Sequence, residues 1–465
     1  MGMDERTFLG ISQEEFGGTR YPMTKDMNMV ELVARIEESG KRLMKALLES
    51  RLEEDPRNNP RDPLCRQCQG PLRIQERAQR RVIKTAIGEM EYRRAYGVCD
   101  RCGHTTAPLD EALGIPPSGP SVEAREKICH AAVVGRSFEN GHEILEVQAR
   151  IPLSAKHVRT LAENEGRDLV EQRDQEIGAY RQGQLTVRAA PSPSLMVVAA
   201  DGGRVQTRHT AAEERWKEDK IGIVYDAMAR PQPHAKPGEY EGARAQTKTY
   251  VATLENWESM GWMLRLEAER RGFAKAKAKV FVADGAQPIR ELKNLHFPEA
   301  TFVLDWAHAA QHLAGCAKAA LGEGTPEAEA WYEKHKQWLW DGKTDQIIRN
   351  LRRLSEQAGP PRDSDVETSP RRILYQNAFS YFPNNKEAMA YPSFRAKGWP
   401  IGSGVAEGSI KQFGLRMKGS EKFWNGLPRV RTETTGAEEM LALCALYHSE
   451  DGRWQQHWHR RAQPR

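Results

Sequence analysis

The chain has 465 residues, of which 39% are hydrophobic and 29% are charged. This length is too great for one compact domain, so we expect two to four folding units. Lysine and arginine number 69 against 64 aspartate and glutamate residues, which leaves a net charge of +5. The balance excludes a histone-like polycation, and any affinity for nucleic acid must come from local basic patches.

Targeting signals are not evident in the sequence. No apolar run approaches the roughly 18 residues that a membrane helix needs, so we expect no association with a membrane. The first residues, MGMDERTFLG, carry acidic side chains where a signal peptide would carry basic ones. We therefore expect the protein to stay in the cytoplasm, with its cysteines reduced.

Residues 1–60 are expected to form an N-terminal helical region. One amphipathic helix over residues 27–54 is predicted from its apolar periodicity, with a role in packing or dimerisation. The next segment, 61–115, contains Cys65-x-x-Cys68 and Cys99-x-x-Cys102. Each such turn offers two thiolates to one tetrahedral zinc ion, so the two pairs predict a single structural zinc site.

Between the cysteine pairs, Val82–Ala86 and Glu89–Tyr96 alternate as the strands of a hairpin would, which completes a zinc ribbon. The hairpin is rich in arginine, and contact with DNA phosphates is one interpretation. A solvated basic face is an equally good alternative. The arginines proposed for DNA contact are Arg80, Arg81, Arg93 and Arg94.

Residues 116–188 are predicted to be helical and to bind DNA. Glu139–Ala149 and Ala155–Glu165 form two helices, and Ser154 caps the second. Lys156 and Arg159 lie near the start of that second helix, as in a helix-turn-helix that enters a major groove. Any three-helix packing unit would give the same pattern.

After a linker over Ala189–Ser194, apolar strands are predicted at 195–200, 220–228, 280–283 and 301–304, with a helix near 254–272. Strands that alternate with helices indicate an α/β sheet. Two of the strands lead into an aspartate followed by glycine, at Asp201 and Asp284. If these strands are neighbours, the carboxylates lie about 5 Å apart at one edge of the sheet.

Carboxylates that close repel one another unless protons or cations intervene. Two Mg²⁺ (or Mn²⁺) ions would satisfy them, and paired ions of this kind support phosphoryl transfer. Asp226 and Asp305 also lie in or after apolar strands, and composition alone does not choose among the four.

The stretch WPIGSGVAEGSIKQFGLRMKGSEKFW (399–424) resembles the signature of the Kra-type insertion-sequence transposases, relatives of the Mutator-like group. FVADGA, FPEATFVLDWAH and ALYHSEDGRW fit the same family, so the resemblance covers roughly residues 195–455. The chain departs from it at KGSEKFW, where relatives more often have a Ser-Gly pair before Arg-Trp. The departure puts DNA contacts in doubt but leaves the glutamate in place.

This resemblance implies a multidomain α/β protein with an RNase H-like catalytic domain formed by 189–320 and 398–430. An all-α insertion (321–397) interrupts the domain, and a basic helical arm (431–465) follows it. The resemblance also implies a catalytic triad of Asp201, Asp284 and Glu407, which would hold the two Mg²⁺ ions. Because the strand of the second aspartate should lie beside that of the first, Asp284 is favoured over Asp305.

Asp305 and His308 would then support the metal centre from just outside it or cap a helix. Glu407 is expected in the first turn of a helix capped by Ser403, with Lys411, Arg416 and Lys418 on the same helix directed at DNA.

The expected function is that of a DNA transposase, which cleaves transposon ends and joins their 3′-OH groups to target DNA. Its partners would be terminal inverted repeats, target DNA and further copies of itself, as a homodimer or larger assembly in a prokaryotic cytoplasm, associated with the nucleoid. An RNase H-like nuclease or resolvase without strand transfer is the first alternative. A domesticated zinc-containing DNA-binding regulator is the second.

Overall fold

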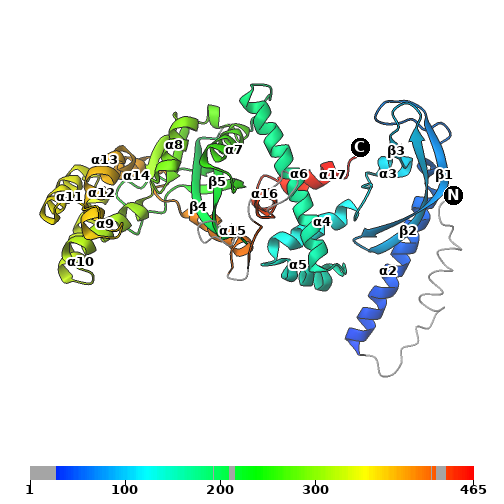
Figure 1. Ribbon diagram of the computed structural model, residues 1–465, viewed down its shortest axis with the longest axis horizontal. Coiled ribbons are helices and arrows are strands. Elements are labelled where there is room, and N and C mark those ends of the chain that lie inside the picture. The colour runs from blue at the N-terminus through cyan, green and yellow to red at the C-terminus, as the bar shows by residue number, and fades with distance from the viewer. Residues whose placement is uncertain (1–27, 192, 209–214, 420–421, 426–435, 465) are drawn as a thin grey trace. The chain divides into compact units, whose positions relative to one another are not determined.

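The computed structural model describes residues 28–191, 193–208, 215–419, 422–425 and 436–464 (Figure 1). The chain forms two compact units. The first comprises Met1–Ala162 and Gly452–Arg465, and the second comprises Glu163–Asp451. The last residues of the chain therefore belong with the first unit, although the sequence predicted one continuous C-terminal arm. The finer division into seven segments stays a prediction.

The first unit contains a three-stranded antiparallel sheet in the order β1-β2-β3, flanked by helices. Its elements are α2 (Met29–Glu54), a 3₁₀ turn (Pro56–Asn58), β1 (Leu72–Thr85), β2 (Gly88–Cys99), β3 (Thr105–Thr106), α3 (Pro108–Leu113), α4 (Val122–Val134), α5 (Phe138–Ile144) with a π-helical turn (Leu145–Ala149), and α17 (Arg453–Arg461). The predicted hairpin is confirmed: β1 begins ten residues earlier than expected and ends one residue earlier, and β2 is longer than expected at both ends. Thr85 pairs with Gly88, so Ala86 and Ile87 form its turn.

Local sequence explains where the first helices begin. Asn28 and Glu31 form a capping box at the start of α2, in which each side chain accepts a hydrogen bond from the other residue's backbone N–H. Ser137 caps α5 by accepting a hydrogen bond from the backbone N–H of Asn140, whose side chain accepts from the backbone N–H of Arg136. The predicted cap at Ser154 is present, but the helix that it opens, α6 (Ala155–Arg181), continues sixteen residues beyond the predicted end at Glu165.

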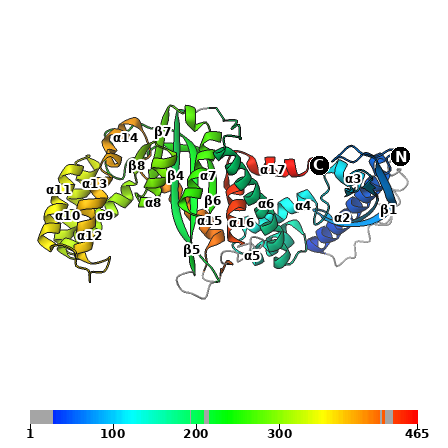
Figure 2. The same cartoon turned by 45° about the horizontal axis from the view of Figure 1, so that its top comes forward.

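The second unit is built on a five-stranded mixed sheet in the order β6-β5-β4-β7-β8 (Figure 2). Its strands are β4 (Leu195–Gln206), β5 (Trp216–Met228), β6 (Arg244–Thr253), β7 (Ala278–Ala283) and β8 (Thr301–Leu304). β5 runs antiparallel to both β4 and β6, whereas β7 runs parallel to β4 and β8 runs parallel to β7. All four predicted strands are present, and β6 is an addition.

Helices cover both faces of this sheet. One face packs on α7 (Trp257–Arg270) and α8 (Gln287–His296), where Val198, Phe281 and Leu264 share a buried core. α15 (Gly404–Met417) packs on β4 and β5, and α16 (Ala437–His448) packs on β6. Side chains alternate between the faces of a strand. Because Ala200 belongs to the α7 core, Asp201 points to the opposite face.

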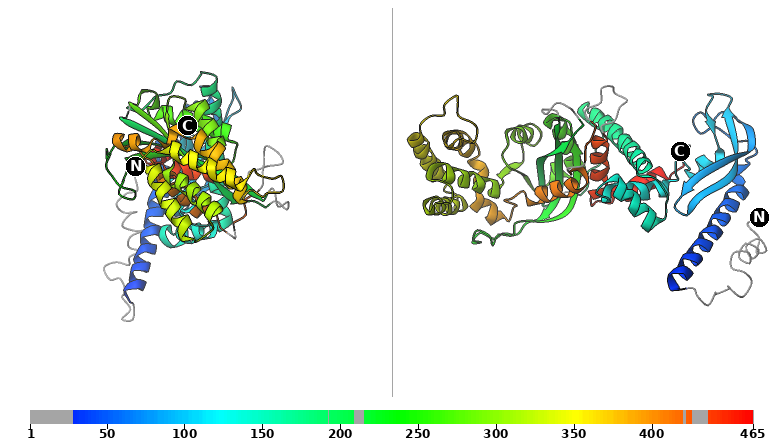
Figure 3. Two further views of the ribbon diagram at one scale, coloured as in Figure 1. Left: turned by 90° about the vertical axis from the view of Figure 1, so that its left-hand side faces the viewer. Right: turned by 60° about the horizontal axis from the view of Figure 1, so that its bottom comes forward.

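All the regular elements described between β8 and α15 are helices, joined by loops (yellow to orange in Figure 3). They form α9 (Trp306–Leu321), α10 (Pro326–Trp340), α11 (Thr344–Ala358), α12 (Pro370–Gln376) with a π-helical turn (Asn377–Tyr381), α13 (Phe382–Asn384), a 3₁₀ turn (Glu387–Met389) and α14 (Tyr391–Lys397). α9 to α12 pack on one another. Across the described ranges, every helix is too short or too polar to cross a lipid bilayer.

Candidate functional site

Three aspartates lie in one row across the parallel strands of the second unit. Leu195 to Ala199 of β4 pair with Ala278 to Val282 of β7 at a constant offset, and continuing this register aligns Asp201 with Asp284. Ala283 of β7 pairs with Leu304 of β8, so the next residues, Asp284 and Asp305, are also aligned. Neighbouring strands lie about 4.8 Å apart. The predicted adjacency of the Asp201 and Asp284 strands is therefore confirmed.

Asp201 does not end its strand, contrary to expectation. β4 continues through Gly202 and Gly203 to Gln206, because β5 supplies antiparallel partners along this whole stretch. What ends at Asp201 is the parallel pairing with β7. The carboxylate of Asp201 therefore lies where β4 is still paired with β5 but no longer paired with β7, and Asp201 is half-buried.

Glu407 is brought to this row by α15. It lies in the first turn of the helix, as predicted, and Ser403 occupies the N-cap position. The Ser403 hydroxyl does not cap the helix, however. It donates to Oδ2 of Asp305 at 2.6 Å and lies 3.2 Å from Oε1 of Glu407. The backbone N–H of Ser403 also donates to Asp305, so this carboxylate ties the start of α15 to the end of β8.

Asp305 is only 1% exposed, and it also caps α9 by accepting from the backbone N–H of His308 at 2.7 Å. Burial alone would raise the pKa of Asp305, but hydrogen bonds from His308 and Ser403 outweigh this and lower it to about 2. Asp305 is therefore an ionised, fully engaged carboxylate. Of the two predicted roles for Asp305, the helix cap is confirmed, and support of a metal centre stays a prediction.

The acidic groups act on one another electrostatically. Burial raises the pKa of Asp201, and the charges of Asp284 and Glu407 raise it further, whereas His308 lowers it. A hydrogen bond with Asp305 raises the pKa of His308, and the charges of Asp284 and Glu407 add to the effect. The five groups therefore form one interacting cluster at the end of the parallel strands.

Part of this cluster is close enough to share one cation. Asp305, His308 and Glu407 each present a ligand atom within 4.8 Å of the other two. Asp284 adjoins them, with its side chain accepting from the backbone N–H of Ala286 at 2.9 Å. Carboxylate oxygens are the preferred ligands of hard divalent cations. These two carboxylates and one imidazole could hold a metal ion, and the set differs from the predicted one because Asp305 and His308, instead of Asp201 and Asp284, form it with Glu407.

The far end of α15 is held by a buried ion pair that sequence reasoning missed. Asp219 on β5 is 0% exposed and lies 3.7 Å from the ammonium of Lys418, the C-cap of the helix. Gly203 faces both groups, and a Cβ there would approach Oδ1 of Asp219 to 2.6 Å and overlap the Lys418 ammonium. In the run WKEDK, three charged residues adjoin Asp219, so composition did not show which of them faces inward.

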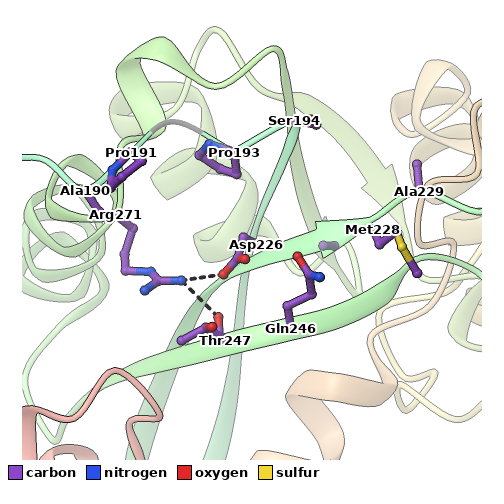
Figure 4. A pocket seen from close by; sticks show the side chains of 11 residues that line it. Ala190, Pro191, Pro193, Ser194, Asp226, Met228, Ala229, Gln246, Thr247 and Arg271 are labelled. Carbon is purple, nitrogen blue, oxygen red and sulfur yellow. Dashed lines mark hydrogen bonds and ion pairs between the residues drawn. The ribbon is translucent and has the colours of Figure 1, made fainter.

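Asp226, the remaining aspartate candidate, lies at the opposite end of the sheet. It pairs with Met196 near the start of β4 and is bound by Arg271, which also donates to the carbonyl of Thr247 (Figure 4). Asp226, Thr247 and Arg271 line a cavity of about 510 Å³. Asp226 therefore takes no part in the carboxylate cluster.

The four predicted zinc ligands come together in the first unit. The sulfur atoms of Cys65 and Cys102 lie 3.7 Å apart and those of Cys68 and Cys99 lie 3.4 Å apart, and all four lie within 4.8 Å of one another. Tetrahedral zinc with bonds of about 2.3 Å requires sulfur separations of about 3.8 Å. The cluster therefore fits one structural zinc ion.

Three of the cations predicted to contact DNA are unsuited to that role. Arg94 is bound to Asp110, Arg81 donates to the carbonyls of Pro116 and Pro117, and Arg416 is 3% exposed and packs over the ring of Trp424. Each of these guanidiniums is held by groups of its own unit instead of projecting into solvent, so the prediction of a surface contact with duplex DNA is corrected at these three positions.

The other residues predicted to contact DNA differ in how exposed their side chains are to solvent. Arg80 is exposed but forms a bidentate pair with Glu91, and Lys418 is partly exposed beside Asp219. Arg159 is half-buried. Arg93, Lys156 and Lys411 are exposed.

Comparisons with known proteins give a family and no named relative. No curated protein matches the chain in sequence. A family model does match residues 23–322, which include the zinc cluster, the whole five-stranded sheet and three of the clustered aspartates. By that match, the chain belongs to the uncharacterised protein family UPF0236.

Proposed function

We propose that this protein is a DNA transposase that cleaves transposon ends and joins them to target DNA with the help of divalent cations. The observation that carries the proposal is the row Asp201–Asp284–Asp305 with Glu407 brought against it by α15. Carboxylates from distant parts of the chain repel one another when they lie together at one sheet edge, and bound cations would neutralise this repulsion.

The sheet supports the same proposal. An RNase H-like catalytic domain requires that the strand of the first catalytic aspartate lie beside that of the second, with the next strand further out. β4, β7 and β8 stand in this order, and an all-helical segment separates β8 from the helix of Glu407. The resemblance of residues 399–424 to Kra-type transposases points to the same chemistry.

In this proposal, Asp201, Asp284 and Glu407 hold two Mg²⁺ or Mn²⁺ ions. Bound ions of this kind activate the attacking oxygen and stabilise the leaving oxygen in phosphoryl transfer. Asp305 positions Glu407, because it fixes Ser403 and with it the first turn of α15. The exposed cations Arg93, Lys156 and Lys411 would contact the DNA backbone.

The test is incubation of the purified full chain with labelled terminal inverted repeats from its own element, a target plasmid and Mg²⁺. Labelled ends joined to plasmid support transposition, cleavage without joining supports an RNase H-like nuclease or resolvase, and binding alone supports a DNA-binding regulator. Asp201→Asn should abolish both products.

A matched control for that variant is Asp226→Asn, the same substitution at the opposite end of the sheet. It should leave both products in place, because Asp226 is engaged by Arg271 and lies apart from the cluster. Equal losses in the two variants would contradict the assignment.

A further inference from the structure

The first unit encloses a cavity of about 680 Å³ that the proposed chemistry does not use. Its walls are formed by residues of the hairpin strands, of the helices α3, α4 and α17, and of the segment 114–117 between α3 and α4. Pockets for small ligands commonly measure about 300–1,000 Å³. The cavity is therefore large enough for a ligand with a ring system and a charged group.

The charge of the lining favours an anion. Five arginines and two acidic residues line the cavity, an excess of three positive charges. The acids, Asp110 and Glu111, are already engaged: Asp110 binds Arg94 and lies 3.7 Å from Arg81, and Glu111 lies 3.9 Å from Arg66. Arg125 on α4 and Arg461 on α17 account for the remaining positive side chains of the lining.

Aromatic rings and buried donors complete the site. Tyr96 and Trp458 both contribute to the walls, and the guanidinium of Arg94 lies 6.0 Å from the centre of the Tyr96 ring. Nε of Arg81, Nε of Arg94 and Nε1 of Trp458 are buried without a hydrogen-bond acceptor in the described part of the chain. Trp458 is 3% exposed and Arg94 is 9% exposed. A buried donor without a partner is costly, so a ligand that brings acceptor oxygens would be stabilised here.

We propose that this cavity binds a nucleotide, with the base against Tyr96 and Trp458 and the phosphate among the arginines. Flat rings favour a base of any sequence, because every base has a face that can stack. The same chemistry is offered by a free nucleotide and by an unpaired nucleotide of a DNA strand. The proposal does not depend on the carboxylate cluster of the second unit.

The experiment measures binding of fluorescein-labelled (dT)8 to the full-length protein by anisotropy, without divalent cations. The double variant Arg125→Gln/Arg461→Gln should weaken binding at least tenfold, which corresponds to about 1.4 kcal/mol. The matched control Arg51→Gln/Arg61→Gln removes two exposed arginines of the same unit that lie outside the cavity. The control should change affinity less than about threefold, through general electrostatics alone.

A second pair of variants tests the base. Tyr96→Phe should bind (dT)8 as the wild type does, and Tyr96→Leu should bind it more weakly, because only the ring is needed for stacking. These variants keep the proposal testable if the arginine variants do not fold, which zinc content and circular dichroism would reveal.

Competition with unlabelled dTMP distinguishes the two sources of the nucleotide. Displacement by dTMP identifies a site for a free nucleotide, and displacement by unlabelled (dT)8 alone identifies a site for a DNA strand. Equal losses in the cavity variants and the control, or unaltered binding by Tyr96→Leu, would overturn the proposal. Binding should persist in Asp201→Asn, so a failure here and a failure of the proposed catalysis remain separate results.

Discussion

The contact between Ser403 and Asp305 is the sharpest test of how Glu407 is held. In Ser403→Ala, the carboxylate of Asp305 loses a hydroxyl donor at 2.6 Å. Water cannot replace this donor, because Asp305 is 1% exposed and Ser403 is 7% exposed. The carboxylate of Asp305 keeps the backbone N–H donors of Ser403 and His308. It therefore loses one of its hydrogen bonds but still has two donors.

The size of the effect follows from the charge of the acceptor. A hydrogen bond to an ionised group contributes about 1.5–3 kcal/mol, and Asp305 is ionised because its pKa lies at about 2. We expect Ser403→Ala to lower the free energy of unfolding of the second unit by about 2 kcal/mol. Ser409→Ala, in the same helix, removes a similarly buried hydroxyl that donates to the carbonyl of Val405 at 2.7 Å and lies 3.5 Å from the hydroxyl of Tyr250, so both of its partners are neutral. Its cost should stay below about 1 kcal/mol, because that bond is neutral and alanine favours the helix.

Urea denaturation at neutral pH measures both free energies, and a double-mutant cycle with Asp305→Asn isolates the contact. In the Asp305→Asn background, the cost of Ser403→Ala should fall below about 1 kcal/mol, because the charged acceptor is gone. Equal costs for Ser403→Ala and Ser409→Ala, or additivity in the cycle, would refute the reasoning.

Three further predictions concern the packing, the zinc site and the excluded aspartate. Gly203→Ala should lower the free energy of unfolding by about 1–3 kcal/mol in urea, because its Cβ would overlap the buried ion pair beneath α15, whereas Gly315→Ala has open space and should cost nothing. Cys65→Ser should reduce zinc, measured by atomic absorption, from one ion per chain to well below one and lower the melting temperature; full zinc content would contradict the four-cysteine site. Asp226→Asn should cost about 1–3 kcal/mol of stability, because Arg271 loses its partner, yet leave Mn²⁺ affinity by calorimetry unchanged; a loss of affinity would place Asp226 in the cluster after all.

Patterns along the chain predicted those parts of the fold that depend on local sequence. The four apolar strands, the long first helix and the paired cysteines each carry their signal within a few residues. β6 was missed because residues 244–253 alternate only weakly between apolar and polar types. The joining of α17 to the first unit was missed because it depends on packing between segments that are far apart in the chain.

At the candidate site, the sequence was more informative about which acidic residues are involved than about the hydrogen bonds that hold them in place. Asp201, Asp284 and Glu407 were singled out and act on one another electrostatically, but the residues that lie close enough to share a metal ion are Asp305, His308 and Glu407. The hydroxyl of Ser403 was expected to cap its helix, but a buried carboxylate is the stronger acceptor and takes it instead.

Charge alone was a poor guide to DNA contacts. Arg94 and Arg416 count as cations in composition, yet one is bound to Asp110 and the other is buried against Trp424. A guanidinium carries the same formal charge wherever it lies, and only the fold decides whether it meets solvent or a carboxylate.

The most direct test of the central claim is the single-turnover rate of Mg²⁺-dependent cleavage of a labelled transposon end by Glu407→Gln. Its matched control is Glu329→Gln, which makes the same change in the first turn of α10. Because even indirect support of a metal ligand is worth about 10–100-fold, we expect Glu407→Gln to lose more than about 100-fold while the control cleaves at the wild-type rate. Cleavage by Glu407→Gln at the wild-type rate would contradict a cation site built from these carboxylates.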